Sequence, residues 1–415
     1  MSIQSKNFMK DIGKYLECYT YDVSVIIVNY NGKRYIDTLF ESLKRVKHVD
    51  FSFEVVFVDN NSSDDSVEYL RSLLPDMPFR VKIVESRKNM GFAGGNNRGV
   101  AASRGEFTVL LNSDTAVEPD WLGELFHAIK DRSCVSMVNS KLLFFYDFVK
   151  VSFNSGSKVR ISDRVMLNGE PYSIEDKYCK NIQRDGKTIK CREQTLIYLP
   201  IYKKDEDLSI ELDIVKANVK EIWVGDRKCS IEDGSVKTVM TAEELESCKK
   251  ALIQNAGSGI NEAFDGYDIG SGDEDGEKYN QPYEINNACG ASLIMRRDEF
   301  IRAGMFDSRF FMYYEDTDLS YRMKLGKRKI MYCPTSVVRH IHTGSSTEWS
   351  PLFTYHVYRN KLLFVYKNIS KIQYLRSFLQ LYRQGKRENN LYKMCGCKDS
   401  LKIIMKLKKN TTFRW

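Results

Sequence analysis

The feature that most constrains the fold is a repeated alternation of short apolar runs and helix-forming segments in the first third of the chain. The run VSVIIVNYNG (23–32) is rich in β-branched residues, and residues 33–46 follow it with apolar side chains at helical spacing. The same unit recurs at 53–74, where FEVVFV leads through DNNSSDDS into a second helical segment. Alternation of this kind predicts an α/β fold with a mostly parallel, doubly wound sheet.

Carboxylates follow two of these apolar runs. Asp59 comes directly after 53–58, and Asp114 lies in the polar cluster NSDT (112–115) that ends the run 107–111. Ligands bind at the carboxyl ends of strands in open α/β sheets, so the pair indicates a nucleotide site, with Asp59 toward the base or ribose and Asp114 toward metal and phosphates. The open alternatives are a helix-capping role for Asp114 and an Asx-turn for Asp59.

Two further features lie near the predicted carboxyl edge of the sheet. Tyr30 lies just past the first predicted strand and could stack on a base, although an aromatic in that position is more often used for packing. The segment GFAGGNNRG (91–99) lacks the G-x-G-x-x-G spacing of dinucleotide-binding proteins. We expect it to precede a short helix, its glycines letting the backbone approach a nucleotide, with polar contacts from Asn96, Asn97 and Arg98.

The middle of the chain changes character. From about residue 152 to 255, strand-like pieces such as LIYLPIY, DLSIEL and EIWVG are separated by charged turns, which predicts an inserted β-rich subdomain. No catalytic constellation stands out in it. The acidic segment 265–280 that follows lacks the spacing of an EF-hand, so a solvated or acceptor-facing loop is expected.

Three acids begin a predicted helix in the segment FFMYYEDTDLSYRMKLG (310–326). Acids such as Glu315, Asp316 and Asp318 favour the dipole of a helix when they lie in its first turn. The functional alternative makes one of them a general base against a sugar hydroxyl, with its pKa tuned by the aromatic surroundings.

A predicted strand after residue 327 ends in two histidines. A neutral imidazole of His340 or His342 could complete a metal shell with Asp114, and the alternative is a polar surface group. Both histidines would point the same way if the strand continued that far.

Composition bounds the location and partners. The net charge of +8 is concentrated after residue 361, where acids are scarce. Residues 356–368 are expected to form a helix with Leu and Phe on one face. Residues 401–410 combine apolar residues with Lys in a way suited to a membrane surface, and a solvated tail is the alternative. No run approaches the ~18 apolar residues of a membrane span, and no signal-peptide core begins the chain. Ten cysteines lack zinc-ligand spacing. We expect a cytoplasmic protein, with the basic C-terminal region as a candidate contact to the inner face of the membrane.

Taken together and in order, these segments resemble the family 2 inverting glycosyltransferases, which have the GT-A fold. The resemblance covers roughly 22–145 and 285–368, and it rests on VSVIIVNYNG, VFVDNNSSDDS, GFAGGNNRG, LLNSDTAVEPDWL, CGASLIMRR, GMFDSRFFMYYEDTDLSYRM and PTSVVRHIHTGSS. Within the family, the chain is most similar to the rhamnosyltransferase-type enzymes of surface polysaccharide assembly.

The resemblance implies roles on the donor side. Asp59 matches the acid that holds the nucleotide base, and Tyr30 lies where the family packs against that base. Asp114 matches the last acid of the D-x-D motif, which binds a divalent ion, Mn²⁺ or Mg²⁺, on the diphosphate. Asn112 replaces the first acid of that motif, so metal binding would depend on Asp114 and His340.

On the acceptor side, the resemblance makes Asp316 the catalytic base. Glu315 would share that role or, with Asp318, position the acceptor or the helix. The implied reaction is inverting transfer of a sugar from a UDP- or dTDP-sugar to a hydroxyl of a saccharide or lipid-linked acceptor, with no nucleic acid involved.

The expected organisation has five parts: a leader (1–21), the nucleotide-sugar half of a GT-A domain (22–150), the β-rich insertion (151–255), the acceptor and catalytic half (256–350) and a basic helical region (351–415). Two other functions are left open. A sugar-phosphate nucleotidylyltransferase is disfavoured because no G-x-G-T-R-type signature follows the first strand. A non-catalytic scaffold that binds nucleotide-sugars would not need the acids that this chain retains.

Overall fold

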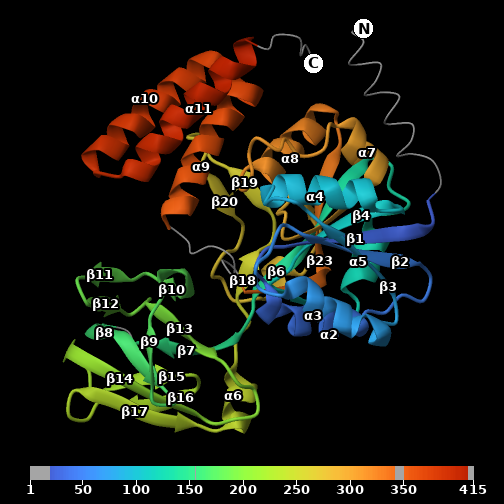
Figure 1. Cartoon of the computed structure of the whole chain (residues 1–415). Helices are drawn as coiled ribbons and strands as arrows, with labels where there is room; N and C mark the ends of the chain where they lie inside the picture. Colours follow the sequence, from blue (N-terminus) through green and yellow to red (C-terminus); the bar gives the residue numbers. More distant parts are fainter. Residues whose placement is uncertain (1–18, 155, 342–349, 410–415) are drawn as a thin grey trace. The chain divides into compact units, whose positions relative to one another are not determined.

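The computed structural model describes residues 19–154, 156–341 and 350–409 (Figure 1). The chain divides into two compact units, which are described separately. The first contains the chain up to Leu142, Asn255–Ile269 and the chain from Tyr279, whereas the second contains Leu143–Gln254 and Gly270–Lys278. The second unit therefore begins before residue 151 and includes part of the acidic segment 265–280.

Four parallel strands form one half of the main sheet, in the order β4-β1-β2-β3. They are β1 (Tyr21–Asn29), β2 (Phe53–Asp59), β3 (Arg80–Glu85) and β4 (Gly105–Asn112). The connecting helices are α2 (Ile36–Lys44), α3 (Ser66–Leu73) and α4 (Gly91–Ala102). Helices α2 and α3 lie on one face of the sheet and α4 on the other (Figure 1). The doubly wound parallel arrangement is confirmed.

The other half of this sheet contains antiparallel pairs. Strand β22 joins β4 on one side and β6 on the other, and β23 pairs with β5 and β21. These elements are β5 (Thr115–Val117), α5 (Trp121–Ile129), β6 (Val135–Phe144), β21 (Tyr283–Glu284), β22 (Ser292–Arg296), α7 (Arg297–Arg302), α8 (Glu315–Leu325) and β23 (Lys329–His340). The β5–β23 pair brings the C-terminal end of β23 beside the turn that follows β4.

The glycine-rich segment, expected to precede a short helix, is itself the first part of helix α4. In α4, a Cβ added at Gly99 would lie 2.3 Å from Cγ2 of Ile26, and one added at Gly95 would lie 2.7 Å from Cγ1 of Val28. Both strand residues belong to β1. The glycines therefore let the backbone of α4 approach the sheet, which places the N-terminal end of α4 at the carboxyl edge of the strands.

The second unit is built from two antiparallel sheets, with strand orders β10-β13-β7-β15-β16 and β11-β12-β8-β14-β17. Its elements are β7 (Asp147–Ser152), β8 (Lys158–Leu167), β9 (Glu170–Ser173), β10 (Cys179–Lys180), β11 (Gln183–Asp185), β12 (Thr188–Arg192), β13 (Leu196–Ile201), β14 (Leu208–Ala217), β15 (Glu221–Val224), β16 (Arg227–Ser230), β17 (Ser235–Met240) and α6 (Ala242–Cys248). Val151, Ile161, Ile197 and Leu212, drawn from both sheets, share one apolar core. The predicted β-rich insertion is confirmed.

The long excursion of the chain into the second unit, Leu143–Gln254, begins in β6 and returns through β18 (Ile253–Asn255), which pairs with β6. Asn139, in the middle of β6, donates from Nδ2 to Oδ1 of Asn255, the first residue of the returning segment, at 3.2 Å. Both side chains are buried. The chain leaves the first unit a second time at Gly270–Lys278, so the second unit is built from two segments.

Helices complete the first unit at its C-terminal end: α9 (Pro351–Phe364), the π-helical turn η5 (Val365–Ile369), α10 (Lys371–Arg387) and α11 (Leu391–Lys409). Their apolar core includes Leu362, Phe364 and Ile404, together with Phe310 and Tyr314 from the segment before α8. The apolar residues of 356–368, predicted to lie on one face of a helix, are thus largely buried. Within the described ranges, no helix combines the length and apolarity needed to cross a bilayer.

Candidate active site

The donor-side carboxylate Asp59 ends β2 directly beside the end of β1. Its register partner is Asn29, whose Nδ2 donates to Oδ1 of Asp59 at 3.3 Å, while the backbone N–H of Ser62 donates to Oδ2 at 3.0 Å. Asp59 is only 5% exposed, whereas Tyr30, the residue after Asn29, is 44% exposed. The structure therefore fixes the carboxylate and leaves the neighbouring aromatic ring accessible.

Asp114 and His340 come together because β5 pairs with β23. This pairing sets His340 opposite Thr115. Nε2 of His340 lies 3.1 Å from Oδ1 of Asp114 and 3.2 Å from Nδ2 of Asn112. Both Asp114 and His340 are buried. His342, the other histidine considered, lies outside the described residues.

The Asp114–His340 pair fits a metal that the donor helps to bind. No group of three or more His, Cys, Asp or Glu side chains gathers at metal-binding distance in the described parts of the chain. Mg²⁺ sites typically use one or two protein carboxylates and complete their coordination with substrate phosphates and water. A carboxylate and an imidazole whose ligating atoms lie 3.1 Å apart can supply the few protein ligands that such a site needs.

Asp316 lies in the first turn of α8 and contacts the segment before β22. Its Oδ2 accepts a hydrogen bond from the backbone N–H of Gly290 at 3.0 Å, and its Oδ1 accepts from that of Thr317 at 2.7 Å. The next residue, Ala291, accepts from the backbone N–H of Asn112 at 3.0 Å. A continuous series of contacts thus joins Asp316 through Gly290, Ala291 and Asn112 to the Asp114–His340 pair.

The two adjacent acids of α8 are in different environments. Burial, followed by the charge of Asp316, holds the pKa of Glu315 well above its usual range. Glu315 is 4% exposed, and its Oε2 has no hydrogen-bond partner within the described residues. Burial also raises the pKa of Asp316, but hydrogen bonds from Gly290 and Thr317 oppose that rise. Glu315 is therefore the better proton holder, and Asp316 the better proton acceptor.

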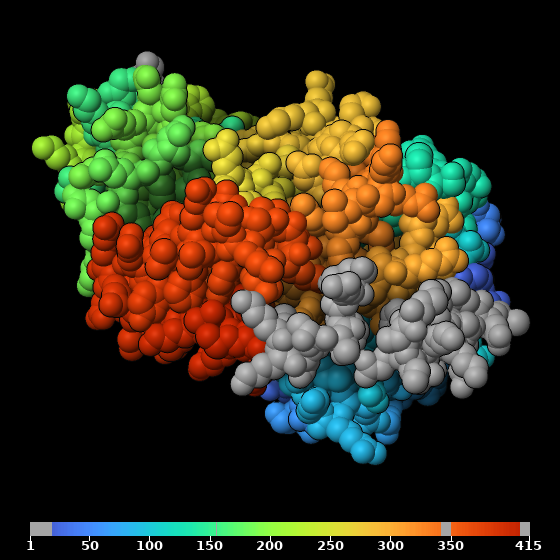
Figure 2. All heavy atoms as spheres, turned by 90° about the horizontal axis from the view of Figure 1, so that it is seen from above, coloured from blue at the N-terminus to red at the C-terminus, as the bar shows by residue number. Residues whose placement is uncertain are grey.

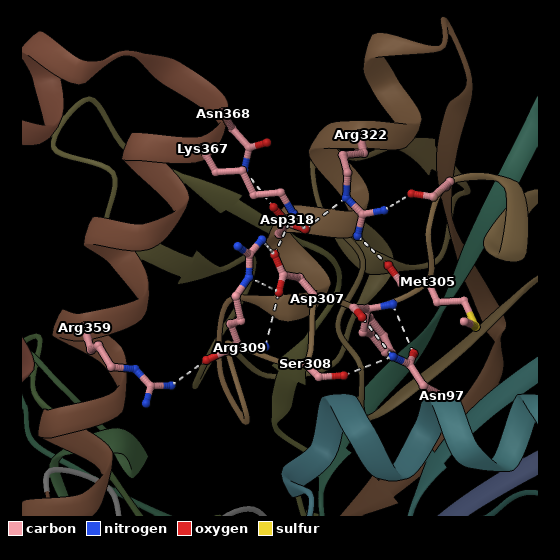
Figure 3. A network of polar contacts seen from close by, with 12 residues as sticks. Asn97, Met305, Asp307, Ser308, Arg309, Asp318, Arg322, Arg359, Lys367 and Asn368 are labelled. Carbon is pink, nitrogen blue, oxygen red and sulfur yellow. Dashed lines mark hydrogen bonds and ion pairs between the residues drawn. The ribbon is translucent and has the colours of Figure 1, made fainter. Parts of the chain in front are cut away.

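The third acid, Asp318, is fully buried, and its carboxylate contacts other side chains of the protein. Its carboxylate accepts from Nε of Arg322 at 2.9 Å, Nζ of Lys367 at 2.9 Å and Nδ2 of Asn368 at 2.8 Å (Figure 3). Lys367 also contacts Asp307 at 3.1 Å. Asp318 therefore ties α8 to η5, which matches the option that it positions the helix.

The polar side chains of α4 contact the protein itself. Asn96 is buried and donates to the carbonyl oxygen of Phe92 in the same helix at 3.0 Å. The exposed Arg98 donates to the carbonyl oxygen of Glu85 at 2.9 Å. Asn97 donates to the carbonyl oxygen of Phe306 and accepts from its backbone N–H. These contacts tie α4 to β3 and to the segment that precedes α8.

Sequence reasoning missed two residues of the site. Asn29 could have been found, because it is a polar residue at the same strand-end position as Asp59. Gly290 contributes a backbone N–H to Asp316, and a backbone donor has no signature in side-chain chemistry.

Comparison with known proteins identifies the domain. Residues 24–158 match the family described as Glycosyl transferase family 2. The match covers about a third of this chain. The chain is 30% identical over 117 residues to the Putative glycosyltransferase EpsH of Bacillus subtilis, covering 28% of this chain and 33% of that protein. It is 35% identical over 101 residues to the Succinoglycan biosynthesis protein ExoO of Rhizobium meliloti, covering 24% of this chain and 28% of that protein.

The matches thus span about a third of the length of these curated relatives. The fold of the chain is similar to a crystal structure described as GalNAc-T7 with UDP, GalNAc and Mn²⁺, with a TM-score of 0.51 and 14% identity over 93% of this chain and 55% of that one. The predicted GT-A fold is confirmed.

Proposed function

We propose that the chain is an inverting glycosyltransferase that moves a sugar from a nucleotide-diphosphate donor to a hydroxyl of a saccharide or lipid-linked acceptor in surface polysaccharide synthesis. The observation that carries the proposal is the series of contacts from Asp316 to the Asp114–His340 pair. It connects a candidate proton acceptor to a candidate diphosphate site, as sugar transfer from such a donor requires.

On the donor side, Tyr30 would stack on the base and Asp59 would accept hydrogen bonds from the base or ribose. Asp114 and His340, with Asn112 beside them, would hold Mn²⁺ or Mg²⁺ against the diphosphate. When bound, the ion neutralises charge on the leaving group. The proposal does not extend to Asn96 and Arg98, because their side chains already donate hydrogen bonds to backbone carbonyl oxygens of the protein.

On the acceptor side, Asp316 would take the proton of the attacking hydroxyl. The hydroxyl oxygen forms a bond to the anomeric carbon as the bond from that carbon to the diphosphate oxygen breaks on the opposite side, so the configuration inverts. Proton transfer to a positioned carboxylate contributes roughly 10²–10⁴-fold to the rate. Glu315 would remain protonated, since burial and the adjacent carboxylate disfavour its charge.

The donor can be identified by thermal stability, because a ligand that binds the folded state raises the melting temperature. UDP-, dTDP- and GDP-sugars should be compared with and without Mn²⁺ or Mg²⁺; the resemblance to rhamnosyltransferase-type enzymes makes a dTDP-sugar the first choice. We expect a shift that requires both the metal and one nucleotide and that Asp114→Ala abolishes.

A transfer assay then separates the alternatives. Release of the nucleoside diphosphate with an acceptor hydroxyl present supports glycosyl transfer. Release of pyrophosphate from a nucleoside triphosphate and a sugar phosphate would support a nucleotidylyltransferase. Donor binding without hydrolysis or transfer under any metal would support a scaffold.

We also propose that the protein works at the inner face of the cell membrane, through one face of α10. Ile372, Leu375 and Leu379 are 68%, 57% and 43% exposed and lie at the i, i+3, i+7 spacing of one helix face. The helix contains Lys371, Arg376, Arg383, Lys386 and Arg387 and no acidic residue, a composition suited to anionic lipid. The surface of the C-terminal helices, red in Figure 2, is broadly exposed.

Co-sedimentation with vesicles containing anionic lipid tests this surface. We expect binding that falls with salt and that the combined change of Ile372, Leu375 and Leu379 to Ser removes. Exposed Val215 and Val239 of the second unit, changed to Ser, form the matched control. Equal binding by both variants would reject α10 as the contact surface.

A further inference from the structure

The segment that leads into α8 has a backbone that needs external support. Phe311, Tyr313 and Tyr314 have φ angles of 67°, 69° and 69°, in the left-handed region that non-glycine residues rarely adopt. Such residues persist only where the surroundings over-determine the conformation, and they cluster at functional sites. Glu315 and Asp316 follow directly, so the contacts that hold this segment also set the position of the proposed base.

One buried side chain of α9 holds most of this segment. Nδ2 of Asn360 lies 2.8, 2.7 and 2.8 Å from the carbonyl oxygens of Phe310, Met312 and Tyr313. Asn360 is completely buried. Its Oδ1 accepts from Nε of Arg359 at 2.9 Å, which fixes the orientation of the amide.

The neighbours of Asn360 reinforce the same segment. Arg359 donates to the carbonyl oxygen of Phe310 at 2.6 Å and to that of Arg309 at 3.1 Å. His356, one turn earlier on the same face of α9, stacks on the ring of Phe311 with centroids 5.2 Å apart and an angle of 14°. One face of α9 thus contacts and supports this short stretch of backbone.

The segment is also connected to the donor half of the site. The backbone N–H of Ala93 in α4 donates to the carbonyl oxygen of Phe311 at 3.0 Å. Gly91 has φ of 69°, and a Cβ there would lie 2.3 Å from the same oxygen. Helix α4 and helix α9 therefore contact the segment together.

We infer that Asn360 is a positioning residue for the proposed transfer: it holds residues 310–314 in the conformation that directs Asp316 onto the N–H of Gly290. The inference rests on the proposed function. Few side chains can replace Asn360, because the buried position requires an NH2 group whose two N–H donors are shared among three carbonyl groups, and an oxygen that accepts from Arg359. Asp has the shape but no donor, and Ser has one donor and no charge.

The test compares Asn360→Asp and Asn360→Ser with Asn390→Asp. Asn390 lies before α11, and its Oδ1 accepts from the backbone N–H of Lys393 at 2.9 Å, a role that Asp preserves. In the Asn360 variants we expect kcat to fall about 10-fold to 100-fold, as a small misplacement of a reacting group can cause, with the KM for the donor within about twofold of wild type. The pH at which activity reaches half its maximum should rise, because Asp316 loses the Gly290 hydrogen bond.

Hydrogen exchange at the Gly290 amide gives a readout that is independent of turnover. Faster exchange in Asn360→Ser, with donor binding and overall melting retained, supports positioning. Unchanged exchange in that variant, or a loss of kcat that only parallels a loss of donor affinity, overturns it. If wild-type protein binds donor but transfers nothing, the proposed function fails, and the exchange of the Gly290 amide still decides whether Asn360 positions Asp316.

Discussion

The donor edge and the start of α8 hold their carboxylates in different ways. Asp59 ends a strand, and Asp114 follows one. Their positions come from parallel pairing and from the short β5–β23 pair. Asp316 instead follows a left-handed segment that depends on α9, almost 50 residues later in the chain. The comparison indicates that the sheet itself positions the proposed donor site, whereas a separate element of the same unit positions the proposed base.

The largest expected effect comes from a substitution that removes the proposed base and leaves the donor edge intact. Asp316→Asn keeps the shape and the hydrogen bond from Gly290 but cannot take a proton, so kcat should fall about 10²–10⁴-fold. The donor-dependent shift in melting temperature should persist. Full transfer activity in a folded variant would show that Asp316 is not the base.

The next substitution removes a carboxylate from the donor edge and leaves the proposed base intact. Asp114→Ala removes the carboxylate proposed to hold the ion, and we expect an increase of at least about tenfold in the metal concentration needed for activity, which is about 1.4 kcal/mol. Activity titrations with Mn²⁺ and Mg²⁺ measure this effect, with Asp120→Ala, an exposed surface change, as the control. An unchanged metal requirement would place the ion elsewhere.

A change in α4 tests how strictly the sheet sets the donor edge. Gly99→Ala places a Cβ 2.3 Å from Cγ2 of Ile26, and overpacking of this kind costs about 1–3 kcal/mol. The gain in helix propensity, about 1 kcal/mol, offsets part of that cost. Chemical denaturation should show a net loss of stability. Gly123→Ala in α5 is the matched control, because its nearest neighbour would be 3.7 Å away.

The smallest expected effect is a pH dependence at Glu315. Its pKa is raised in the folded state, so the stability linked to its proton is fully present below about pH 4.3, the ordinary value, and is lost as pH rises through the raised value. The amide of Glu315→Gln does not titrate. The melting temperature of wild type relative to this variant should therefore fall with rising pH, and a constant difference would contradict the raised pKa.

The donor edge and the start of α8 also differ in how far they could be predicted from the sequence. Strand ends were visible in the sequence because apolar runs of β-branched residues stop at polar clusters, which located Asp59 and Asp114. The role of 91–99 was misjudged, since glycines that admit a ligand and glycines that admit a neighbouring strand have the same local sequence. The support of Asp316 by Asn360 and Gly290 depends on contacts between distant segments and on backbone groups, which periodicity does not encode.

The neighbouring side chains of Asn139 and Asn255 have a consequence for how such a chain can be altered. Most of the second unit is one continuous stretch, Leu143–Gln254, whereas Gly270–Lys278 is a second and shorter excursion. The order of the strands that carry the carboxylates does not depend on the long stretch. A gene in which residues 143–254 are replaced by a short linker would still encode Asp114 and His340, proposed to hold the metal, and Asp316, the proposed base. Lineages could thus gain or lose this module while the chemistry of the parent domain stays under separate selection.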